Sequence, residues 1–324
     1  MATNFQPRGD IKVIMGSGAK NLGTAHVAGD TWDELQVVDY NIEHASAPID
    51  VAPSRSGIYG QVESQGHHRP DTQIYEVTLT MRGTPTAVLK SCLSLFGDGT
   101  SAAALTSASS TGSMKDDVSN ASQVTLLFEN AGSDSTDIDV VMAGCIATQM
   151  VIREDVGTNG GEMVVETTFI TAYQPSEESL APSSTTVDEA APKNIFDITT
   201  STLDGSALIL NNFEITISRP LARVHHQNTS DYKPFGYVQT GPYEVTGSIT
   251  AKRDDSIHAL IDHIKGDSGG VTLTLGESSG FTLSLPDVMI DNSKPEVSDF
   301  LLQTIPFRAF GANEAGNIIS ITIA

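Results

Sequence analysis

The sequence predicts an all-β fold, organised as two tandem β-sandwich or barrel units that each carry one short flanking helix. Three observations support this prediction. Ser, Thr and Gly are abundant while Lys is scarce, β-branched residues are frequent, and one strand-and-helix pattern occurs twice in the chain. With 324 residues, the chain is long enough for two domains of about 130–170 residues each.

The repeated strand is the clearest local signal. In Tyr75–Arg82 the residues Tyr, Val, Leu and Met alternate with Glu, Thr, Thr and Arg, and residues 243–252 show a similar alternation. Alternation with period two over eight residues is typical of a strand that buries one face.

A short helix is expected directly after each of these strands. In the first copy, Thr84 has the residue type of an N-cap, Pro85 suits the first helical position and Gly97 ends the element. In the second copy Asp254 or Asp255 begins a segment whose apolar residues recur at helical spacing, and Gly266 ends it. The predicted helices are residues 85–96 and 256–265.

The two copies share further features on either side of this unit. A strand precedes it in each copy, at residues 35–42 and 213–218, and a long irregular connection follows that strand, at residues 43–74 and 219–242. Each copy also ends on a similar strand, because residues 166–173 align without gaps to residues 303–310.

These features divide the chain into a first β domain at residues 1–173, a linker at 174–194 and a second β domain at 195–324. The linker is rich in Pro and acidic residues. The first domain is longer because of a Ser/Ala/Thr-rich insertion near residues 100–123, for which we expect a surface loop.

Charge and composition limit the function. A net charge of −22 excludes nonspecific duplex binding by phosphate neutralisation as a main activity. The first eight residues lack the cationic start and apolar core that a secretion signal would have. The most apolar window, residues 138–152, is too short and too polar to span a bilayer. We therefore expect a soluble protein made in a cytoplasm. Cys92 and Cys145 are expected to be ordinary buried thiols.

The order of elements resembles that of the phage tail tube protein family. In the second copy, the strand–helix unit at residues 243–266 precedes strands at 271–275 and 281–285, a turn at 285–288, and finishing strands near 300–310 and 318–323. The resemblance implies a structural virion protein of the tail, assembled in the host cytoplasm, whose subunits form stacked rings through which DNA is delivered.

The resemblance also implies partners. Two-domain members of the family count as two ring positions, so we expect a trimer that acts as a pseudo-hexamer, in contact with tape measure and tail terminator or baseplate proteins. DNA would pass without specific binding, and no cofactor or membrane is implied.

Two groups of residues are expected to carry this function. The polar faces of the repeated strands should line the channel: Glu76, Thr78, Thr80, Glu244, Thr246 and Ser248. The long loops at 43–74 and 219–242 should contact neighbouring subunits through aromatic anchors, because such side chains bury much area at low entropic cost: Tyr59, Tyr232, Phe235 and Tyr237.

Other interpretations remain open. One is another virion β-protein, such as a tail terminator, baseplate ring component or capsid decoration protein; a less favoured one is a β-rich carbohydrate-active enzyme with two hidden carboxylates. The pairs His67–His68 and His225–His226 suggest a metal site, but adjacent residues of a strand point to opposite faces. The Gly-rich residues 157–161 lack the Lys-Ser/Thr of a phosphate loop and predict a hairpin turn.

Overall fold

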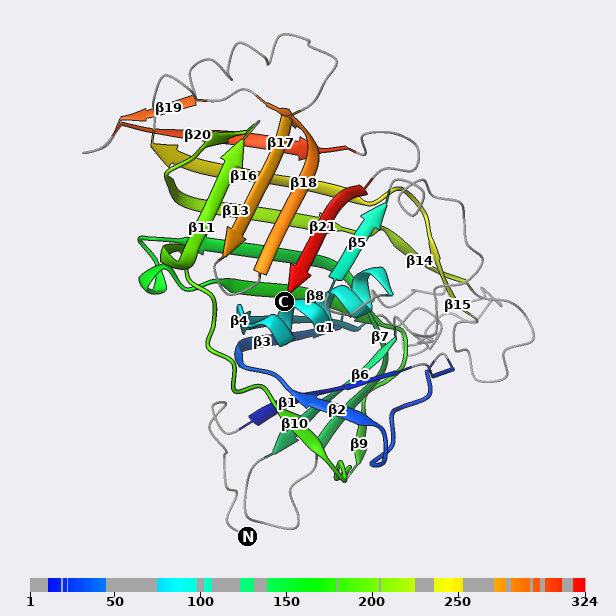
Figure 1. The fold of residues 1–324 in the computed structure, drawn as a ribbon. Coiled ribbons are helices and arrows are strands. Elements are labelled where there is room, and N and C mark those ends of the chain that lie inside the picture. Colours follow the sequence, from blue (N-terminus) through cyan, green and yellow to red (C-terminus); the bar gives the residue numbers. More distant parts are fainter. Residues whose placement is uncertain are drawn as a thin grey trace, which may run out of the picture.

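The computed structural model of the protein describes residues 11–18, 20–21, 23–44, 75–97, 102–106, 123–130, 139–178, 180–203, 205–224, 236–252, 271–277, 281–291, 294–297, 301–310 and 317–323. Within these residues there is one α-helix, α1 (Pro85–Phe96), and two single-turn 3-10 helices, η4 (Asn159–Gly161) and η5 (Ile195–Asp197). The remaining regular structure is strand, so the predicted all-β class is confirmed (Figure 1).

Eight strands joined by antiparallel ladders form one long sheet. Their order across the sheet is β3 (Val37–His44), β4 (Tyr75–Arg82), β8 (Val164–Thr171), β7 (Asp139–Asp155), β13 (Leu210–Ser218), β16 (Glu244–Lys252), β20 (Leu301–Ala309) and β19 (Lys294–Val297). In Figure 1 this series rises from β3, a little below the middle of the view, to β19 at the top.

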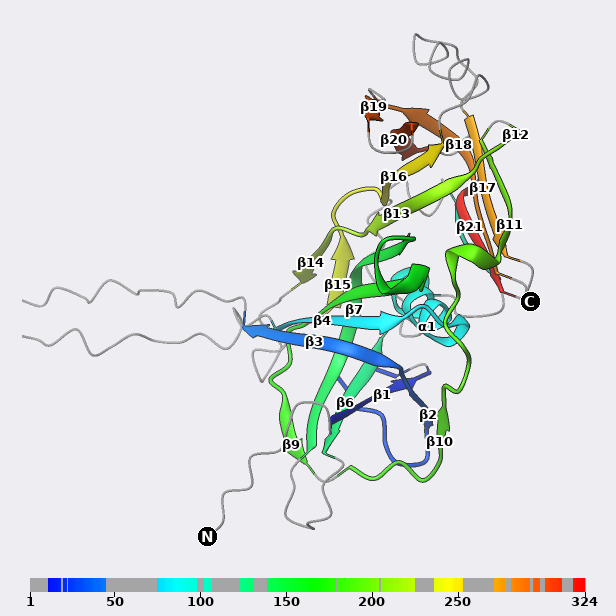
Figure 2. The same ribbon diagram turned by 90° about the vertical axis from the view of Figure 1, so that its left-hand side faces the viewer.

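A second layer lies on one side of the long sheet, together with α1 (Figure 2). In the first half of the chain it contains β2 (Thr31–Glu34), β1 (Ile11–Ser17) and β6 (Val124–Asn130), and it joins the long sheet through β7. In the second half it contains β12 (Ser206–Ala207), β11 (Ile198–Leu203), β17 (Val271–Glu277), β18 (Phe281–Ile290) and β21 (Asn317–Ile323), and β18 joins it to β20.

Both halves of the chain show the same strand order. The ladders run β2-β1-β6-β7-β8-β4-β3 in the first half and β12-β11-β17-β18-β20-β16-β13 in the second. The irregularities also coincide, since β3 and β13 each carry one extra residue, Val38 and Asn211, opposite their partner strands.

A second pair of bulges lies in β7 and β18. Each strand has one extra residue opposite its hairpin partner, between Met142 and Cys145 in β7 and between Leu285 and Val288 in β18. The turn predicted at residues 285–288 is therefore wrong: the chain bends there but continues as the same strand. A bulge increases local twist and curvature without ending a strand, which is why the residues at this position have the composition of a turn.

The gapless alignment of residues 166–173 with 303–310 is also wrong, by one residue. Both β8 and β20 bury their odd-numbered residues, including Phe169 and Phe307. The gapless alignment instead matches Phe169 with Pro306, on the opposite face of β20. A shift of one residue reverses the face of every side chain in a strand. Because similar residue types occur on both faces of these strands, the sequence alone does not distinguish the two alignments.

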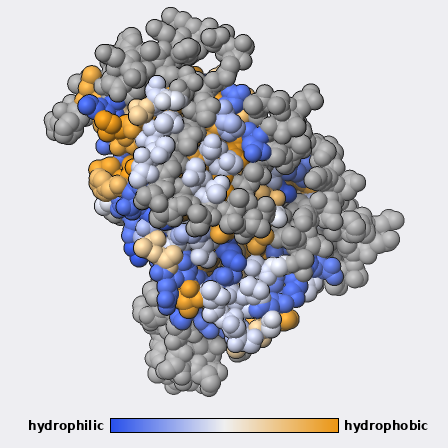
Figure 3. Space-filling view, in the orientation of Figure 1, coloured by the Kyte–Doolittle hydropathy of each residue, from blue (hydrophilic) through white to orange (hydrophobic). Residues whose placement is uncertain are grey.

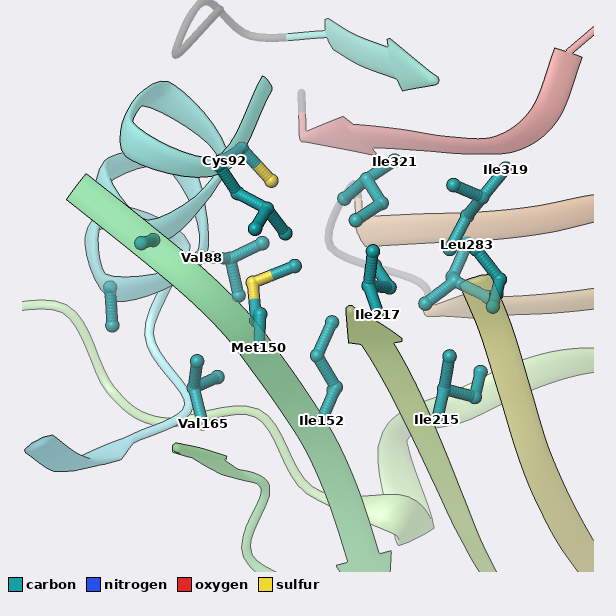
Figure 4. Packing of buried hydrophobic residues seen from close by; sticks show 14 of the residues in the cluster. Val88, Cys92, Met150, Ile152, Val165, Ile215, Ile217, Leu283, Ile319 and Ile321 are labelled. Carbon is teal, nitrogen blue, oxygen red and sulfur yellow. The ribbon is translucent and has the colours of Figure 1, made fainter. Parts of the chain in front are cut away.

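One hydrophobic core runs through both halves of the chain, between the long sheet and the second layer. Figure 4 shows Met150 and Ile152 of β7 beside Ile217 and Ile215 of β13, with Ile321 of β21 above them. These five side chains are essentially inaccessible to solvent. Burying a large aliphatic side chain contributes roughly 1.5–3 kcal/mol, so the two halves share a large part of their stability.

The predicted helix at residues 85–96 is confirmed, with the predicted caps. The Thr84 hydroxyl accepts a hydrogen bond from the Ala87 amide at 3.1 Å, Pro85 occupies the first turn, and Gly97 ends the helix in the left-handed conformation, with φ of 79°. The predicted strand at Tyr75–Arg82 is likewise confirmed as β4. The predicted helix at 256–265 lies outside the described residues.

Three segments expected to be irregular contain strands. The connection at 219–242 carries β14 (Leu221–Val224) and β15 (Gly236–Gln239), which pair as a hairpin. Within the insertion at 100–123, residues Ala102–Thr106 form β5, which pairs with β21. The linker at 174–194 carries β9 (Ser176–Glu178), paired with β7, and β10 (Thr185–Val187), paired parallel with β2. The Gln36 amide also donates to the carbonyls of Asp188 and Ala190, so this segment packs against the first half of the chain.

Candidate functional site

The six residues predicted to line a channel lie on one face of the long sheet. Glu76, Thr78 and Thr80 alternate along β4 with buried Val77 and Leu79. Three further residues alternate along β16 in the same way: Glu244, Thr246 and Ser248. None of the six side chains is in the core; they are exposed or half-buried.

The ladders show that the two sets share this face. Directly paired residues of neighbouring strands point to the same side of a sheet. One row of paired residues crosses seven strands from β3 to β20: Asp39, Thr80, Glu166, Val151, Thr216, Thr246 and Arg308. We call this surface the polar face; it comprises the residues of this row and the alternate residues of the same strands.

Sequence reasoning missed most of the polar face. The additional polar residues come mostly from five other strands: Asp39, Asn41 and Glu43 of β3, Glu166 and Thr168 of β8, Gln149, Arg153 and Asp155 of β7, Asn212, Glu214, Thr216 and Ser218 of β13, and Thr304 and Arg308 of β20. The alternation within β8 and β13 could have revealed their share. Of the β7 residues, Gln149 falls in the most apolar window of the sequence, residues 138–152, and Arg153 and Asp155 follow it directly. Because β7 takes part in both layers, it buries residues on both faces and does not alternate along its whole length.

Hydroxyl groups are prominent on the polar face. The side chains of Thr78 and Thr168 share a hydrogen bond of 3.2 Å, and those of Thr250 and Thr304 share one of 2.9 Å. Such cross-strand Thr pairs stabilise neighbouring strands, and they leave a surface of small polar groups.

The cations of the polar face are largely engaged by carboxylates. The described residues of the face include seven carboxylates and four cations: Asp39, Glu43, Glu76, Asp155, Glu166, Glu214 and Glu244, against Arg82, Arg153, Lys252 and Arg308. Arg308 pairs with Glu244, Arg82 with Glu162, and Arg153 with Glu166 at 3.5 Å. The face therefore has net negative charge and few cations available to a passing phosphate.

Three of the four predicted loop anchors, Tyr59, Tyr232 and Phe235, lie outside the described residues. The fourth, Tyr237, lies in the hairpin of β14 (Leu221–Val224) and β15 (Gly236–Gln239) and is 1% exposed. Its hydroxyl accepts a hydrogen bond from the Ala172 amide at 2.9 Å, and burial raises its pKa. In this chain, Tyr237 holds the hairpin against its own first half, so its ring is not presented to a neighbour.

The described residues give no support to a phosphate-binding loop or a metal site. Residues 157–161 form a tight turn after β7, where the Asp155 carboxylate accepts from the Gly157 amide at 2.8 Å. Among the described residues no group of three or more potential metal ligands occurs; both His pairs lie outside them. Cys92 and Cys145 are free and buried, as predicted, and burial raises the pKa of Cys145 to about 12.

No helix in the described part of the chain is long and apolar enough to cross a membrane. Comparison with curated proteins gives no match. Comparison with family models gives a match to a model described as phage tail tube protein. The matched residues are 7–309, nearly the whole chain. That family is structural and not a family of enzymes. Because the match covers both halves and every strand of the long sheet, the chain belongs to the phage tail tube protein family.

Proposed function

We infer that this protein polymerises into stacked rings that form the tail tube of a phage, the conduit through which DNA is delivered. Membership of the tail tube family is the basis of this inference. The structural observation that supports it best is the long sheet, which has one continuous polar face and ends in two unpaired edge strands among the described residues. An exposed sheet edge is a site for pairing with another chain, and closing a ring removes it.

Each chain fills two positions of the ring. The shared seven-strand order and the coincident bulges support a duplication, with residues 1–173 and 195–324 as the two units. Three chains then make a ring with six similar positions. The same duplication explains why the chain is twice as long as one β-sandwich of this kind requires.

The polar face lines the channel in this proposal. Its opposite face is buried in the core, so the polar face must meet water, and in a closed ring part of that water is inside. Duplex DNA carries one negative charge per roughly 1.7 Å. A wall of hydroxyls and carboxylates repels it weakly, whereas a basic wall would bind it and slow its passage.

The loops at 43–74 and 219–242 connect rings in this proposal, with Tyr59, Tyr232 and Phe235 as anchors. The tube assembles in the host cytoplasm, becomes part of the virion tail, and contacts the tape measure and the terminator or baseplate proteins at its ends. A terminator, baseplate ring or decoration protein would share the fold but would stop at one or a few rings.

Negative-stain microscopy of the purified protein tests the proposal. We expect hollow tubes of uniform diameter and variable length, formed at high protein concentration. Single rings that never stack would favour a terminator or baseplate component. A protein that stays monomeric even when it is supplied with tail tips or baseplates to start assembly would contradict the proposal.

A further inference from the structure

The long sheet ends at two edges, β3 and β19. Among the described residues, β3 pairs only with β4, and β19 pairs only with β20. The two edges lie at opposite ends of the sheet (Figure 1). A ring of identical chains can close only if one edge of each chain meets the other edge of the next.

The chain contains an internal example of such a junction. The first strand of the second half, β13, pairs antiparallel with β7 of the first half, from Asn212 opposite Asp155 to Ser218 opposite Gln149. We call this ladder the internal seam. On its core side Ile215 lies opposite Ile152, and both are fully buried.

The strand order shows which segments are equivalent to the two sides of the internal seam. The strand β3 holds the place of β13, since each pairs with the next strand of its own half and carries one extra residue. On the other side β7 pairs along β8, whereas β20 is paired first by β18 and then by β19. The segments β18 and β19 together therefore hold the place of β7.

We propose that β3 of one chain pairs antiparallel with β19 of the next chain, in the register of the internal seam, and that this pairing closes the ring. This inference rests on the proposed function. Matching the ladder of β7 on β8 to that of β19 on β20 sets Arg153 equivalent to Glu296, and matching the bulges sets Glu214 equivalent to Asn41. Because Arg153 lies opposite Glu214, Glu296 lies opposite Asn41 in the proposed seam.

The residues on the two edges suit this register. It sets the apolar Tyr40 opposite Val297 and Ile42 opposite Pro295. It also sets Asn41 opposite Glu296 and the acidic Glu43 opposite the basic Lys294. Opposite charges across neighbouring strands stabilise a pair, whereas like charges destabilise it.

Exposure of β3 also indicates a missing partner. Ile42 is 38% exposed, while its equivalent in the internal seam, Ile215, is 0% exposed. Tyr40 is half-buried, while its equivalent, Phe213, is 3% exposed. An edge strand with apolar residues exposed to water is a pairing hazard unless it is covered, and the next chain would cover it.

Pro295 disfavours pairing of the β19 edge in registers other than the proposed one. At the two ends of the internal seam, the Thr148 carbonyl accepts from the Arg219 amide just after β13, and the Val156 amide donates to the Asn211 carbonyl of β13. The even-numbered residues of β7 therefore point their backbone groups across the seam. Pro295 is equivalent to one of these, Ile152, and a proline has no N–H to donate. The proposed seam therefore has one ladder bond fewer than the internal seam, and a proline at an edge discourages pairing in other registers.

Disulfide cross-linking tests the seam. The variant Asn41→Cys with Glu296→Cys should give covalent multimers when assembled tubes are mildly oxidised, and either substitution alone should give only monomers. The matched control is Arg153→Cys with Glu214→Cys, at the equivalent position of the internal seam, which should cross-link within one chain. The native Cys92 and Cys145 are buried and should not contribute.

A second pair checks the register. Asn41→Cys with Lys294→Cys places the thiols on diagonal neighbours, about 7–8 Å apart, beyond the usual reach of a disulfide, so it should cross-link far less. If Asn41→Cys with Glu296→Cys forms tubes that do not cross-link while the internal control does, the proposed seam is wrong but the proposed tube function is unaffected. If wild-type protein forms no tubes, the proposed function itself fails.

Charge reversal provides a second test of the register if the cysteine variant does not assemble into tubes. Glu43→Lys alone and Lys294→Glu alone should each reduce the yield of tubes, because each sets like charges opposite one another. The double variant should restore the yield. Equal losses in the double variant and the single variants would overturn the register.

Discussion

At the scale of single residues, buried polar groups connect elements that are distant in sequence. The hydroxyl of Thr84 caps α1 by accepting from the Ala87 amide and also donates to the carboxylate of Asp188 in the segment after β10. His26 is 2% exposed and contacts the hydroxyl of Thr125 in β6 and the carbonyl of Gly18 just after β1. In each case one side chain connects two distant parts of the chain, and removing it takes a hydrogen bond from a buried polar group.

We expect Thr84→Ala to lower the free energy of unfolding by about 2 kcal/mol, from the lost cap and the hydrogen bond lost at Asp188 Oδ2. Thr84→Ser keeps the hydroxyl and should lose much less. The exposed Thr186→Ala is the surface control. Urea unfolding followed by circular dichroism measures all three, and equal losses for Thr84→Ala and Thr84→Ser would show that the hydroxyl is unimportant.

His26 predicts a pH dependence of stability. Its Nδ1 lies 2.8 Å from the Thr125 hydroxyl and its Nε2 lies 3.2 Å from the Gly18 carbonyl, and burial lowers its pKa. Because the unfolded chain binds a proton at this residue more readily, the stabilisation is complete above the unfolded pKa of about 6.5 and is lost as the pH falls through it.

The comparison of wild type with His26→Gln between pH 7.5 and pH 5 isolates this effect, since all other histidines are shared. The wild type should lose more stability over this range than the variant. Each unit by which folding lowers a pKa corresponds to about 1.4 kcal/mol. Parallel pH profiles would contradict the assignment.

At the scale of elements, the C-terminal end of α1 connects the two halves of the chain. The Leu95 carbonyl accepts from the Arg219 guanidinium at 2.9 Å and from the Tyr243 hydroxyl at 2.8 Å. The guanidinium also lies 5.5 Å from the centre of the Tyr243 ring. The last carbonyls of a helix need such donors, and here both donors come from the second half.

A double-mutant cycle should detect this shared carbonyl. In Arg219→Met or Tyr243→Phe, Leu95 keeps one donor, whereas the double variant leaves its buried carbonyl without either. We expect the double variant to lose about 1 kcal/mol more than the sum of the two single losses, measured by urea unfolding. Strict additivity would show that the two contacts act independently.

Local signals in the sequence predicted individual elements well. The alternation of β4 and the residues Thr84, Pro85 and Gly97 are sufficient to locate a strand and a capped helix, because alternation and capping depend on neighbours in the chain. Pairing between distant segments was not predictable in the same way. The insertion strand β5 pairs with β21, more than 200 residues later in the chain, and its Ala-rich sequence carries no sign of that partner.

The candidate site was predicted in part, for the same reason. Glu76 and Glu244 stood out because their strands alternate, but β7 lies in both layers and buries residues on each face along part of its length. Its contribution to the polar face, including Gln149 and Arg153, is visible only when its ladders to β8 and β13 are known.

At the scale of the whole molecule, the two faces of the long sheet have different roles: one packs in the core and the other, the polar face, meets solvent. The core face connects the sheet to α1 and to the second layer (Figure 4). Hydrophobic residues still reach the surface near one end, as Figure 3 shows at the upper left, and Met289 and Leu301 are about half exposed. We expect that end to be covered in the assembled tube.

Charge reversal on the polar face should impair DNA delivery but not assembly. Glu76→Lys with Glu244→Lys places cations where carboxylates now stand, and it sets one of them beside Arg308. The channel should then bind DNA across a distance that the Debye length of about 8 Å screens only partly. Phage carrying this variant should form normal tails but eject DNA slowly.

The matched control is a charge reversal away from the polar face. Glu189→Lys changes an exposed residue of the segment between the two halves and should leave ejection unchanged. Infection at the wild-type rate by Glu76→Lys with Glu244→Lys would show that the polar face is not the channel wall, even if the protein forms tubes.

The measurement that tests the central claim most directly is a cryo-electron microscopy reconstruction of the assembled tube. The account predicts three chains in each ring, six similar positions around the axis, and the side chains of Glu76, Thr78, Thr246 and Ser248 facing the channel. Six chains in each ring, or a channel lined by another surface with the polar face outside, would contradict it.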